Sequence, residues 1–395
     1  MLRSMFSSIS GLRSHQTMMD VTANNIANVN TAGFKSSATV FQDALSQLLQ
    51  APGAPDPGGA IGGTNPAQVG LGTRVAGISS NFGQGASQST GKSTDLMISG
   101  DGFFVVEKSG QQFYTRSGAF SFDAVGNLVT TDGAFVQGWL ANAGVVSTTG
   151  PLVDLKLPVG TLLPPVATTT VTTTGNLPGG AATGTVLTTS IPTYDAAGVA
   201  TNVIATFTKL AGTPEWSVTL DRGAVNVPAA NLDFSPAGTT PTPTTMTIAG
   251  ITVDLSALTN YAGATTVGAT SQNGSAVGSL QSFTLGNDGS LQGVFSNGLR
   301  QTLGQVAMAA FNNPQGLEKA GNTTFRETVN SGVVQVGAPG TGPRGTLTGG
   351  SLEMSNVDLS QEFTNLIISQ RGFQANSRVI TASDELLQDL VNMKR

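Results

Sequence analysis

The chain has 395 residues, of which only 10% are charged, and 23 acidic against 18 basic residues give a net charge of −5. This length allows two or three domains, and the shortage of positive charge argues against binding to nucleic acid or to a membrane through a polybasic patch. The chain has no cysteine, which excludes disulfides and thiolate chemistry.

No apolar run reaches the ~20 residues that a membrane-spanning helix needs. The start of the chain, MLRSMFSSISGLRSHQ, lacks the apolar core and the cleavage site of a secretory signal. If the protein leaves the cytoplasm, we therefore expect it to do so by another route.

The N-terminal segment, residues 1–35, predicts an amphipathic helix with the seven-residue spacing of a coiled-coil seam. One polar residue, Gln16, interrupts the seam. Its apolar members are Leu2, Met5, Ile9, Leu12, Met19, Ala23 and Ile26. The helix runs into a cluster of asparagines, beyond which Gly33 is expected to end it in a left-handed conformation and Phe34 to pack back on it.

The C-terminal segment, residues 356–395, predicts a second amphipathic helix, with Asn356 or Ser355 as its N-terminal cap. Its main apolar residues lie seven apart, and further apolar residues, among them Phe363, widen the stripe. The seven-residue series is Leu366, Phe373, Ile380 and Leu387. The pattern alone leaves open whether the two helices pair or lie separately on one globular domain.

Between these helices the sequence is typical of β structure. We expect residues 36–74 to connect as a short helix over 38–50 and a Pro/Gly-rich loop over 50–72. Residues 75–145 and 281–355 carry short apolar runs between turn signals and predict one inner β domain. The threonine-rich residues 146–280 suggest either a disordered stalk or an inserted outer β domain, and alternating segments such as TNVIATFTKL favour the folded insert.

No motif in the sequence points to catalysis or to a bound cofactor. His15 is the only histidine, and without cysteine it cannot begin a metal cluster, so we expect a packing or surface residue. The segment DAVGNLVTTD, residues 123–132, lacks the alternating ligands of a calcium loop and predicts a hairpin turn. The carboxylates are few and scattered, which leaves a glycosidase pair open without supporting one. We predict no enzyme activity, no cofactor and no metal.

Several linked motifs resemble those of the bacterial flagellar rod and hook family of axial proteins. Residues 98–106 and 114–139 resemble its β-domain segments, residues 347–395 its C-terminal region, and residues 296–328 are most similar to its hook members. The N-terminal motif ANNIANVNTAGFK matches at Asn24, Asn25, Ala27, Asn28, Thr31, Gly33, Phe34 and Lys35.

The resemblance implies an α+β fold in which coiled-coil-like terminal helices form an inner layer that lines a channel, with nested all-β domains at larger radius. It implies a structural subunit that polymerises into a flexible, curved hook tube, which encloses the export channel and transmits torque from rod to filament. The implied partners are further copies of the chain, the rod, hook cap and hook–filament junction proteins, and the flagellar export apparatus. Neither nucleic acid nor membrane insertion is implied, and the location is extracellular, in the flagellum, without a cleaved signal peptide.

The expected polymer interface combines the apolar seams with the asparagine-rich motif. Its residues are Leu2, Met5, Ile9, Leu12, Met19, Asn24, Asn25, Ile26, Ala27, Asn28, Thr31, Gly33, Phe34, Lys35, Phe363, Leu366, Gln370, Phe373, Ile380 and Leu387. Asn25 and Asn28 have a local alternative as caps of the helix end. Two other functions stay open: a distal rod protein of the same family, because of the loop at 50–72, and an exported adhesin or glycan-binding protein.

Overall fold

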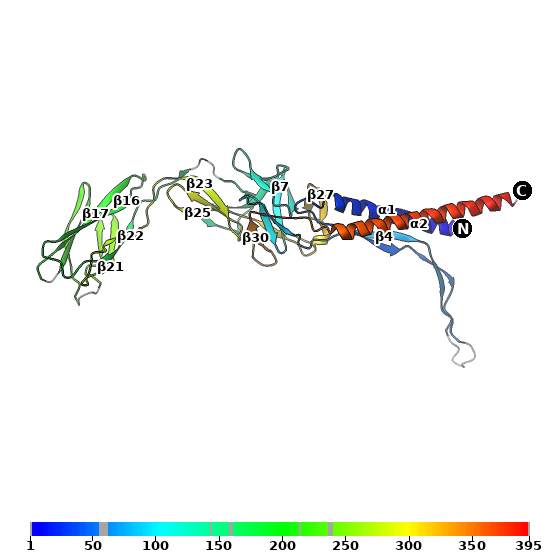
Figure 1. The fold of residues 1–395 in the computed structure, drawn as a ribbon, viewed down its shortest axis with the longest axis horizontal. Helices are drawn as coiled ribbons and strands as arrows, with labels where there is room; N and C mark the ends of the chain where they lie inside the picture. Colours follow the sequence, from blue (N-terminus) through cyan, green and yellow to red (C-terminus); the bar gives the residue numbers. More distant parts are fainter. Residues whose placement is uncertain are drawn as a thin grey trace. The chain divides into compact units, whose positions relative to one another are not determined.

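The structure is a computed structural model that describes residues 2–54, 62–142, 144–157, 160, 162–212, 215–235 and 240–393. Helix α1 (Leu2–Ala27) begins the described chain and helix α2 (Leu359–Asn392) ends it (Figure 1). The sequence between the two helices forms strands and, in its described part, one short 3₁₀ helix, η1 (Pro314–Gly316). The predicted α+β class, with terminal helices and nested β structure, is confirmed.

The chain divides into two compact units. Unit 1 comprises residues 1–157, 284–292 and 302–395, and contains both helices. Its strands are β1 (Ser37–Asp43), β2 (Ser46–Gln50), β3 (Ala67–Gly70), β4 (Thr73–Ser80), β5 (Ser87–Ser89), β6 (Leu96–Ser99), β7 (Phe103–Lys108), β8 (Gln111–Thr115), β9 (Phe120–Phe122), β10 (Leu128–Thr130), β11 (Phe135–Asn142), β12 (Val145–Val146), β13 (Val153–Asp154), β26 (Met308–Ala310), β27 (Glu318–Gly321), β28 (Thr324–Arg326), β29 (Gln335–Gly337), β30 (Thr346–Gly349) and β31 (Ser351–Glu353).

Unit 2 comprises residues 158–283 and 293–301. Its own strands are β14 (Leu162–Leu163), β15 (Thr170–Asn176), β16 (Val186–Tyr194), β17 (Ala200–Lys209), β18 (Trp216–Arg222), β19 (Val225–Leu232), β20 (Thr245–Ile248), β21 (Ile251–Thr259) and β22 (Gly268–Gln272). The boundary between the units falls inside β23 (Gly278–Leu285), β24 (Ser290–Phe295) and β25 (Arg300–Val306).

The core of unit 1 is built around β7, which pairs with β8 on one side and with β11 and β26 on the other. Its four apolar residues are all buried, because successive side chains of a strand point to opposite faces and both faces are covered. Phe103 and Val105 join one apolar cluster, with Tyr114, and Phe104 and Val106 join another. The strand therefore serves two cores at once.

The prediction of a short helix over residues 38–50 is wrong. These residues form β1 and β2, which pair antiparallel with β4 and β3. The partner strands lie beyond the Pro/Gly-rich loop, so local periodicity could not reveal the hydrogen bonds that make this segment extended. Part of that loop, residues 55–61, lies outside the described residues.

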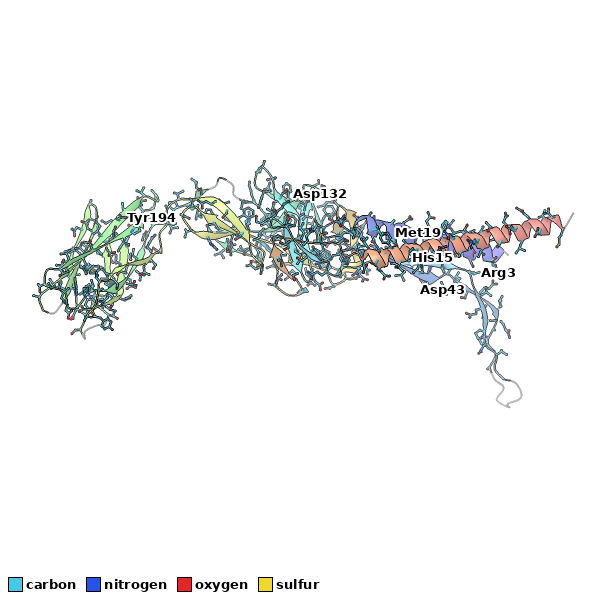
Figure 2. The ribbon with its side chains drawn as sticks, in the orientation of Figure 1. Arg3, His15, Met19, Asp43, Asp132 and Tyr194 are labelled. Atoms are coloured by element: carbon cyan, nitrogen blue, oxygen red, sulfur yellow. The ribbon has the colours of Figure 1, made fainter. Side chains whose placement is uncertain are left out.

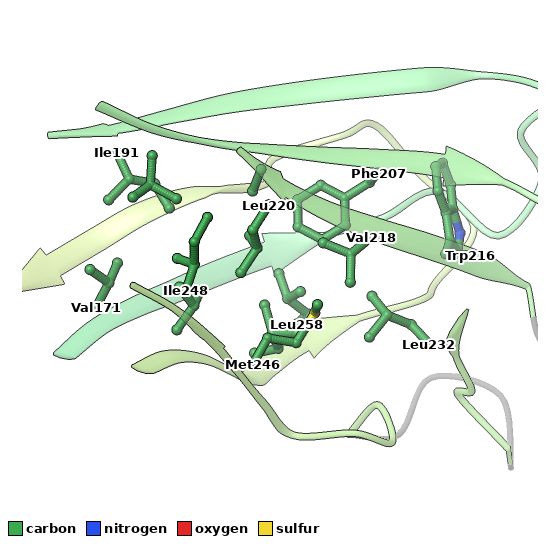
Figure 3. Packing of buried hydrophobic residues seen from close by; sticks show 14 of the residues in the cluster. Val171, Ile191, Phe207, Trp216, Val218, Leu220, Leu232, Met246, Ile248 and Leu258 are labelled. Carbon is green, nitrogen blue, oxygen red and sulfur yellow. The ribbon is translucent and has the colours of Figure 1, made fainter. Parts of the chain in front are cut away.

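Unit 2 is a sandwich of two four-stranded sheets, ordered β16-β17-β18-β19 and β20-β21-β15-β22. The inward-facing residues of both sheets form one buried apolar cluster, in which Trp216 and Phe207 are the largest side chains (Figure 3). Threonine alternates with these apolar residues, as in β15 around Val171 and in β21 around Val253. The unit begins later than the predicted insert, because Leu155 packs in the core of unit 1 and β12 and β13 pair with β11.

Truncating a core residue of unit 2 is predicted to destabilise that unit alone. Ile248 is fully buried and Ile204 is exposed on the same unit. We expect Ile248→Ala to lower the free energy of unfolding of unit 2 by about 2–5 kcal/mol, because it removes buried methyl groups and leaves a cavity. Calorimetry should show the transition of unit 2 shifted and that of unit 1 unchanged. The matched control, Ile204→Ala, should change stability by less than about 0.5 kcal/mol; equal effects would contradict the sandwich.

Candidate functional site: the paired terminal helices and their junction

Helices α1 and α2 pack side by side in opposite directions, so that both ends of the chain lie at the same end of the helix pair (Figure 1). His15 and Met19 lie along the part of α1 that α2 accompanies (Figure 2). The side chain of Asn25 near the end of α1 donates a hydrogen bond of 3.0 Å to Glu362 in the first turn of α2. The helix pair is therefore built from segments at opposite ends of the sequence.

The buried residues of the two helices are small or polar. In α1 they are Ser8, Gly11, Ser14, Thr22 and Asn25, and in α2 they are Ser369 and Ser383. Small side chains allow the two backbones to approach closely, and they bury little apolar area. The hydrophobic periodicity missed these residues because it counts apolar positions alone, although serine, glycine and asparagine do repeat along one face of α1.

The apolar series of both helices is mostly half-buried within one chain. The half-buried members are Met5, Leu12, Met19, Ile26, Leu366, Phe373, Ile380 and Leu387. Ile9 and Phe363 are exposed, as are Ala27 and Gln370. The side chain of Leu2 lies outside the described residues. Most of the area of the expected seam is thus covered within one chain, and Ile9 and Phe363 leave the largest exposed fractions.

Helix α1 ends at Ala27, well before Gly33, so the prediction that this glycine ends the helix is wrong. The last turn is closed locally, since the Asn28 side chain donates to the Asn24 carbonyl at 2.9 Å and accepts from the Thr31 hydroxyl at 3.1 Å. Asn28 therefore caps the helix end, the local alternative for this residue. Asn24 is exposed and Thr31 half-buried.

Gly33 has a different task at the junction with the β domain. Its φ of +72° is left-handed, and its N–H donates to the Glu353 carbonyl at 2.7 Å. A Cβ here would collide with the backbone nitrogen of Ser117, so only glycine allows the chain to pass so close. The next residue, Phe34, lines a cavity of about 400 Å³, with the Lys319 ammonium 5.2 Å from its ring centre.

The carboxylate of Glu353 is surrounded by donors from three parts of unit 1. Its Oε1 accepts from Lys35 Nζ at 2.6 Å and from the Gly85 N–H at 2.9 Å, and its Oε2 lies 3.5 Å from Arg116 Nη1. All three charged side chains are buried. Lys35 also donates to the Gly83 carbonyl at 2.8 Å. We call Lys35, Arg116 and Glu353 the junction cluster.

The junction cluster holds two cations and one carboxylate away from water. Burial lowers the pKa of Lys35, against the opposing effect of Glu353, and burial also lowers the pKa of Arg116. An unfolded chain would hold the Lys35 proton more tightly, so the charged lysine by itself costs stability at neutral pH and depends on the carboxylate. Sequence reasoning missed Glu353 and Arg116, because their charges become informative only once the fold brings them together.

Three predicted interface residues lie in the interior of a single chain. Asn25 donates to the Ser37 carbonyl at 2.7 Å and accepts from the Ser37 N–H at 3.0 Å, in addition to its bond with α2. Asn25, Gly33 and Lys35 are all buried. Their contacts are filled within one chain, and their place in a polymer interface stays a prediction.

The N-terminal cap of α2 is Asp358, whose carboxylate accepts from the N–H groups of Ser360 and Gln361. The predicted cap, Asn356 or Ser355, is wrong. The Asn356 side chain instead accepts from the Ser36 N–H at 2.8 Å and donates to two carbonyls of residues 81–83. It therefore joins the segment after α1 to the segment before α2.

Neither described helix is long and apolar enough to cross a membrane. Within the described part of the chain, no three His, Asp or Glu side chains gather where they could hold a metal ion.

Neutralising Glu353 is predicted to destabilise unit 1. Glu353→Gln leaves Lys35 and Arg116 buried without a carboxylate, and we expect a loss of about 3–5 kcal/mol in the free energy of unfolding, measured by denaturant titration of the full chain. The matched control is Glu318→Gln, which breaks a pair with Arg326 that is more than half exposed and should cost less than about 1 kcal/mol. Similar losses in both variants would contradict a special role for the junction cluster.

Three family models match the chain. Residues 5–35 match the flagella basal body rod protein model, residues 97–177 the flagellar hook protein FlgE/F/G D1 domain, and residues 348–393 the flagellar basal body rod FlgEFG protein C-terminal model. The models at residues 5–35 and 348–393 cover most of the two helices, and the model at residues 97–177 covers β7 to β13 of unit 1 and continues into unit 2.

Full-length relatives extend these matches over the whole chain. The flagellar hook protein FlgE of Borreliella burgdorferi is 38% identical over 445 residues, covering 100% of both chains. The flagellar basal-body rod protein FlgG of Bacillus subtilis is 34% identical over 396 residues, again covering 100% of both. The crystal structure of Helicobacter pylori hook protein FlgE2 shares the fold, with a TM-score of 0.52 at 15% identity over 68% of this chain and 100% of that one. The chain belongs to the flagellar hook protein FlgE family, whose members are structural proteins of the flagellum.

Proposed function

We propose that this chain polymerises through its terminal helices into the flexible tube of the hook. The observation that carries the proposal is the exposure of large apolar side chains on α2. The exposed fractions are 49% for Phe363, 58% for Ile367, 54% for Ile368 and 55% for Leu386. About half of the surface of each of these four side chains stays uncovered within one chain.

An apolar stripe of this kind is stable in water only when another surface covers it. Burying a fully exposed side chain of this kind contributes about 1.5–3 kcal/mol, so covering the remaining half of each contributes about half of that. If copies of the chain cover each other's stripes through a heterologous contact that does not close, the product is a helical polymer. The proposed interface consists of the exposed and half-buried apolar residues of both helices, from Met5 to Ile26 and from Phe363 to Leu387, together with Leu2 from the sequence pattern. Gln370, Asn24, Ala27, Asn28, Thr31 and Phe34 complete it.

The nested chain order supports a layered assignment within such a tube. We propose that the helices of residues 1–35 and 356–395 form the inner layer around the export channel. The β part of unit 1 lies outside them, and unit 2 lies at the outer radius. In this arrangement the helices carry the continuous contacts and the outer β units accommodate bending as torque passes from rod to filament.

The remaining partners follow from this place in the flagellum. We propose contacts with rod, hook cap and hook–filament junction proteins at the ends of the tube, and passage through the flagellar export apparatus to an extracellular location. The full-length similarity to rod protein FlgG supports a straight rod segment as the second candidate. Electron microscopy of the purified chain after salt-induced assembly tests both candidates. Curved tubes would support the hook, straight tubes would support the rod, and the absence of tubes would contradict both.

Removing one exposed apolar side chain from α2 is predicted to weaken assembly. Ile367→Ser should raise the protein concentration required for tube formation at least about fourfold, because Ile367 is 58% exposed, so its burial contributes about 0.9–1.7 kcal/mol, and each 1.4 kcal/mol is a factor of ten. Sedimentation of tubes at graded concentrations measures this. The matched control is Ile204→Ser on unit 2, which is also exposed and should leave the required concentration within about twofold. An unchanged Ile367→Ser variant would contradict the interface.

Linking the outer units is predicted to stiffen the tube without preventing assembly. The chain has no native cysteine, so Val225→Cys, at an exposed position of unit 2, supplies a unique attachment point. After assembly, a bifunctional maleimide should reduce the spread of tube curvature in electron micrographs, because linked outer units can no longer slide. A monofunctional maleimide on the same variant is the control. Unchanged curvature at high cross-linking yield would contradict the proposed role of unit 2 in bending.

A further inference from the structure

The two terminal helices meet in one constant register. Three contacts define it: Asn25 with Glu362, His15 with Gly372, and Gly11 with Asn376. In each of these pairs the two residue numbers add up to 387, as an antiparallel pairing without slippage requires. The contacts extend over about four turns of α1.

Each helix contains one glycine, and each glycine faces a polar side chain of the opposite helix. A Cβ on Gly372 would lie 2.5 Å from Cε1 and Nε2 of His15. A Cβ on Gly11 would lie 2.9–3.0 Å from the amide group of Asn376. These distances are shorter than van der Waals contact, so His15 and Asn376 occupy the space that a larger residue would need.

Both side chains are held in place from a second side. The ring of His15 meets the ring of Phe41 edge to face, with ring centres 5.7 Å apart, and its Nδ1 is buried without a hydrogen-bond partner in the described structure. Its position is therefore determined by packing. The Asn376 amide donates to the Gly372 carbonyl at 2.9 Å, which orients it and joins the two contacts on α2.

A glycine inside a helix is costly, since it is less favourable than alanine by about 1 kcal/mol. We propose that the two glycines are present because His15 and Asn376 lock the helices into this antiparallel register. This inference rests on the proposed function, because it names how the inner layer of each subunit is formed before neighbours cover it. We call these two contacts, His15 with Gly372 and Asn376 with Gly11, the lock. They select the α2 of the same chain because each side chain fits the space that the opposite glycine leaves.

The apolar series cannot provide this register. A seven-residue series meets itself again after a shift of seven residues, and its side chains are only partly covered. The same shift would place His15 opposite Asn365 or Val379 and Asn376 opposite Ser4 or Met18. All four have a Cβ, whereas the residue in the observed pairing is a glycine. In a slipped pairing His15 and Asn376 would therefore collide with a Cβ of the opposite helix.

A double-mutant cycle on the full chain tests the lock. We expect Gly372→Ala alone to weaken helix pairing at least about tenfold and to lower the melting temperature of the helical signal in circular dichroism. With His15→Ala in the same chain, the collision is gone and Gly372→Ala should strengthen pairing by up to about fivefold, relative to His15→Ala alone, through helix propensity. A rise in melting temperature on Gly372→Ala in the unmodified background would overturn the proposal.

A cysteine pair measures the register directly. The distance from a Cβ on Gly11 to the Asn376 amide carbon, 3.0 Å, suits the span from one Cβ to the far sulfur of a disulfide. Gly11→Cys/Asn376→Cys should therefore oxidise within one chain in high yield. The control shifted by seven residues, Gly11→Cys/Ser369→Cys, should oxidise at least about tenfold more slowly. Comparable rates would overturn the proposal.

Both readouts report pairing within a single chain, so they separate this inference from the proposed function. If the helices pair in this register and the chain forms no tubes, the proposed function fails and the lock stands. If tubes form although the shifted cysteine pair oxidises as fast as the predicted one, the lock fails and the proposed function stands.

Discussion

The position of both terminal helices depends on one buried carboxylate. Glu353 precedes α2, Lys35 follows α1, and Arg116 belongs to the β core, so that the junction cluster joins three parts of the chain at one point. A buried ion pair is seldom more stabilising than apolar packing of the same volume. Its donors and acceptors must, however, meet in one geometry, and the neighbouring left-handed Gly33 and the two-sided amide of Asn356 reinforce that geometry. The cluster therefore determines where the helices begin and end relative to the β core.

Polar and apolar residues of the two helices make different contacts. Within one chain, small and polar residues bring α1 and α2 together, as Ser369 in their contact illustrates. The larger apolar residues, such as Ile367, point away from that contact and remain accessible. A subunit can thus complete its own helix pair while keeping its most adhesive surface for the polymer. This division also explains why a side chain such as Asn25, which is typical of the family motif, is buried within the chain.

The helices and many strands were predictable from local periodicity. Alternation identified β17 and β21, and the turn signal at Val125–Asn127 identified the hairpin of β9 and β10. Long-range partners were not predictable. Local pattern predicts a helix for β1 and β2, because their partner strands β4 and β3 lie beyond a long loop. It gives no sign of the junction cluster, because Lys35 and Glu353 are 318 residues apart. In the candidate site the two amphipathic helices were predicted from their apolar spacing, whereas the polar contact between them carries no hydrophobic signal.

The separation of 337 residues between Asn25 and Glu362 has a consequence for the order of folding. Closing so long a loop is slow, and contacts between distant residues form late. Once the β core has folded and the junction cluster has formed, however, the end of α1 and the start of α2 are already neighbours, and pairing the helices becomes as local as closing a hairpin. The effective concentration of one helix for the other then depends only on the short segments between the cluster and the helices. A chain that starts unfolded would therefore fold its β core first and pair its two terminal helices last, from the junction toward the termini.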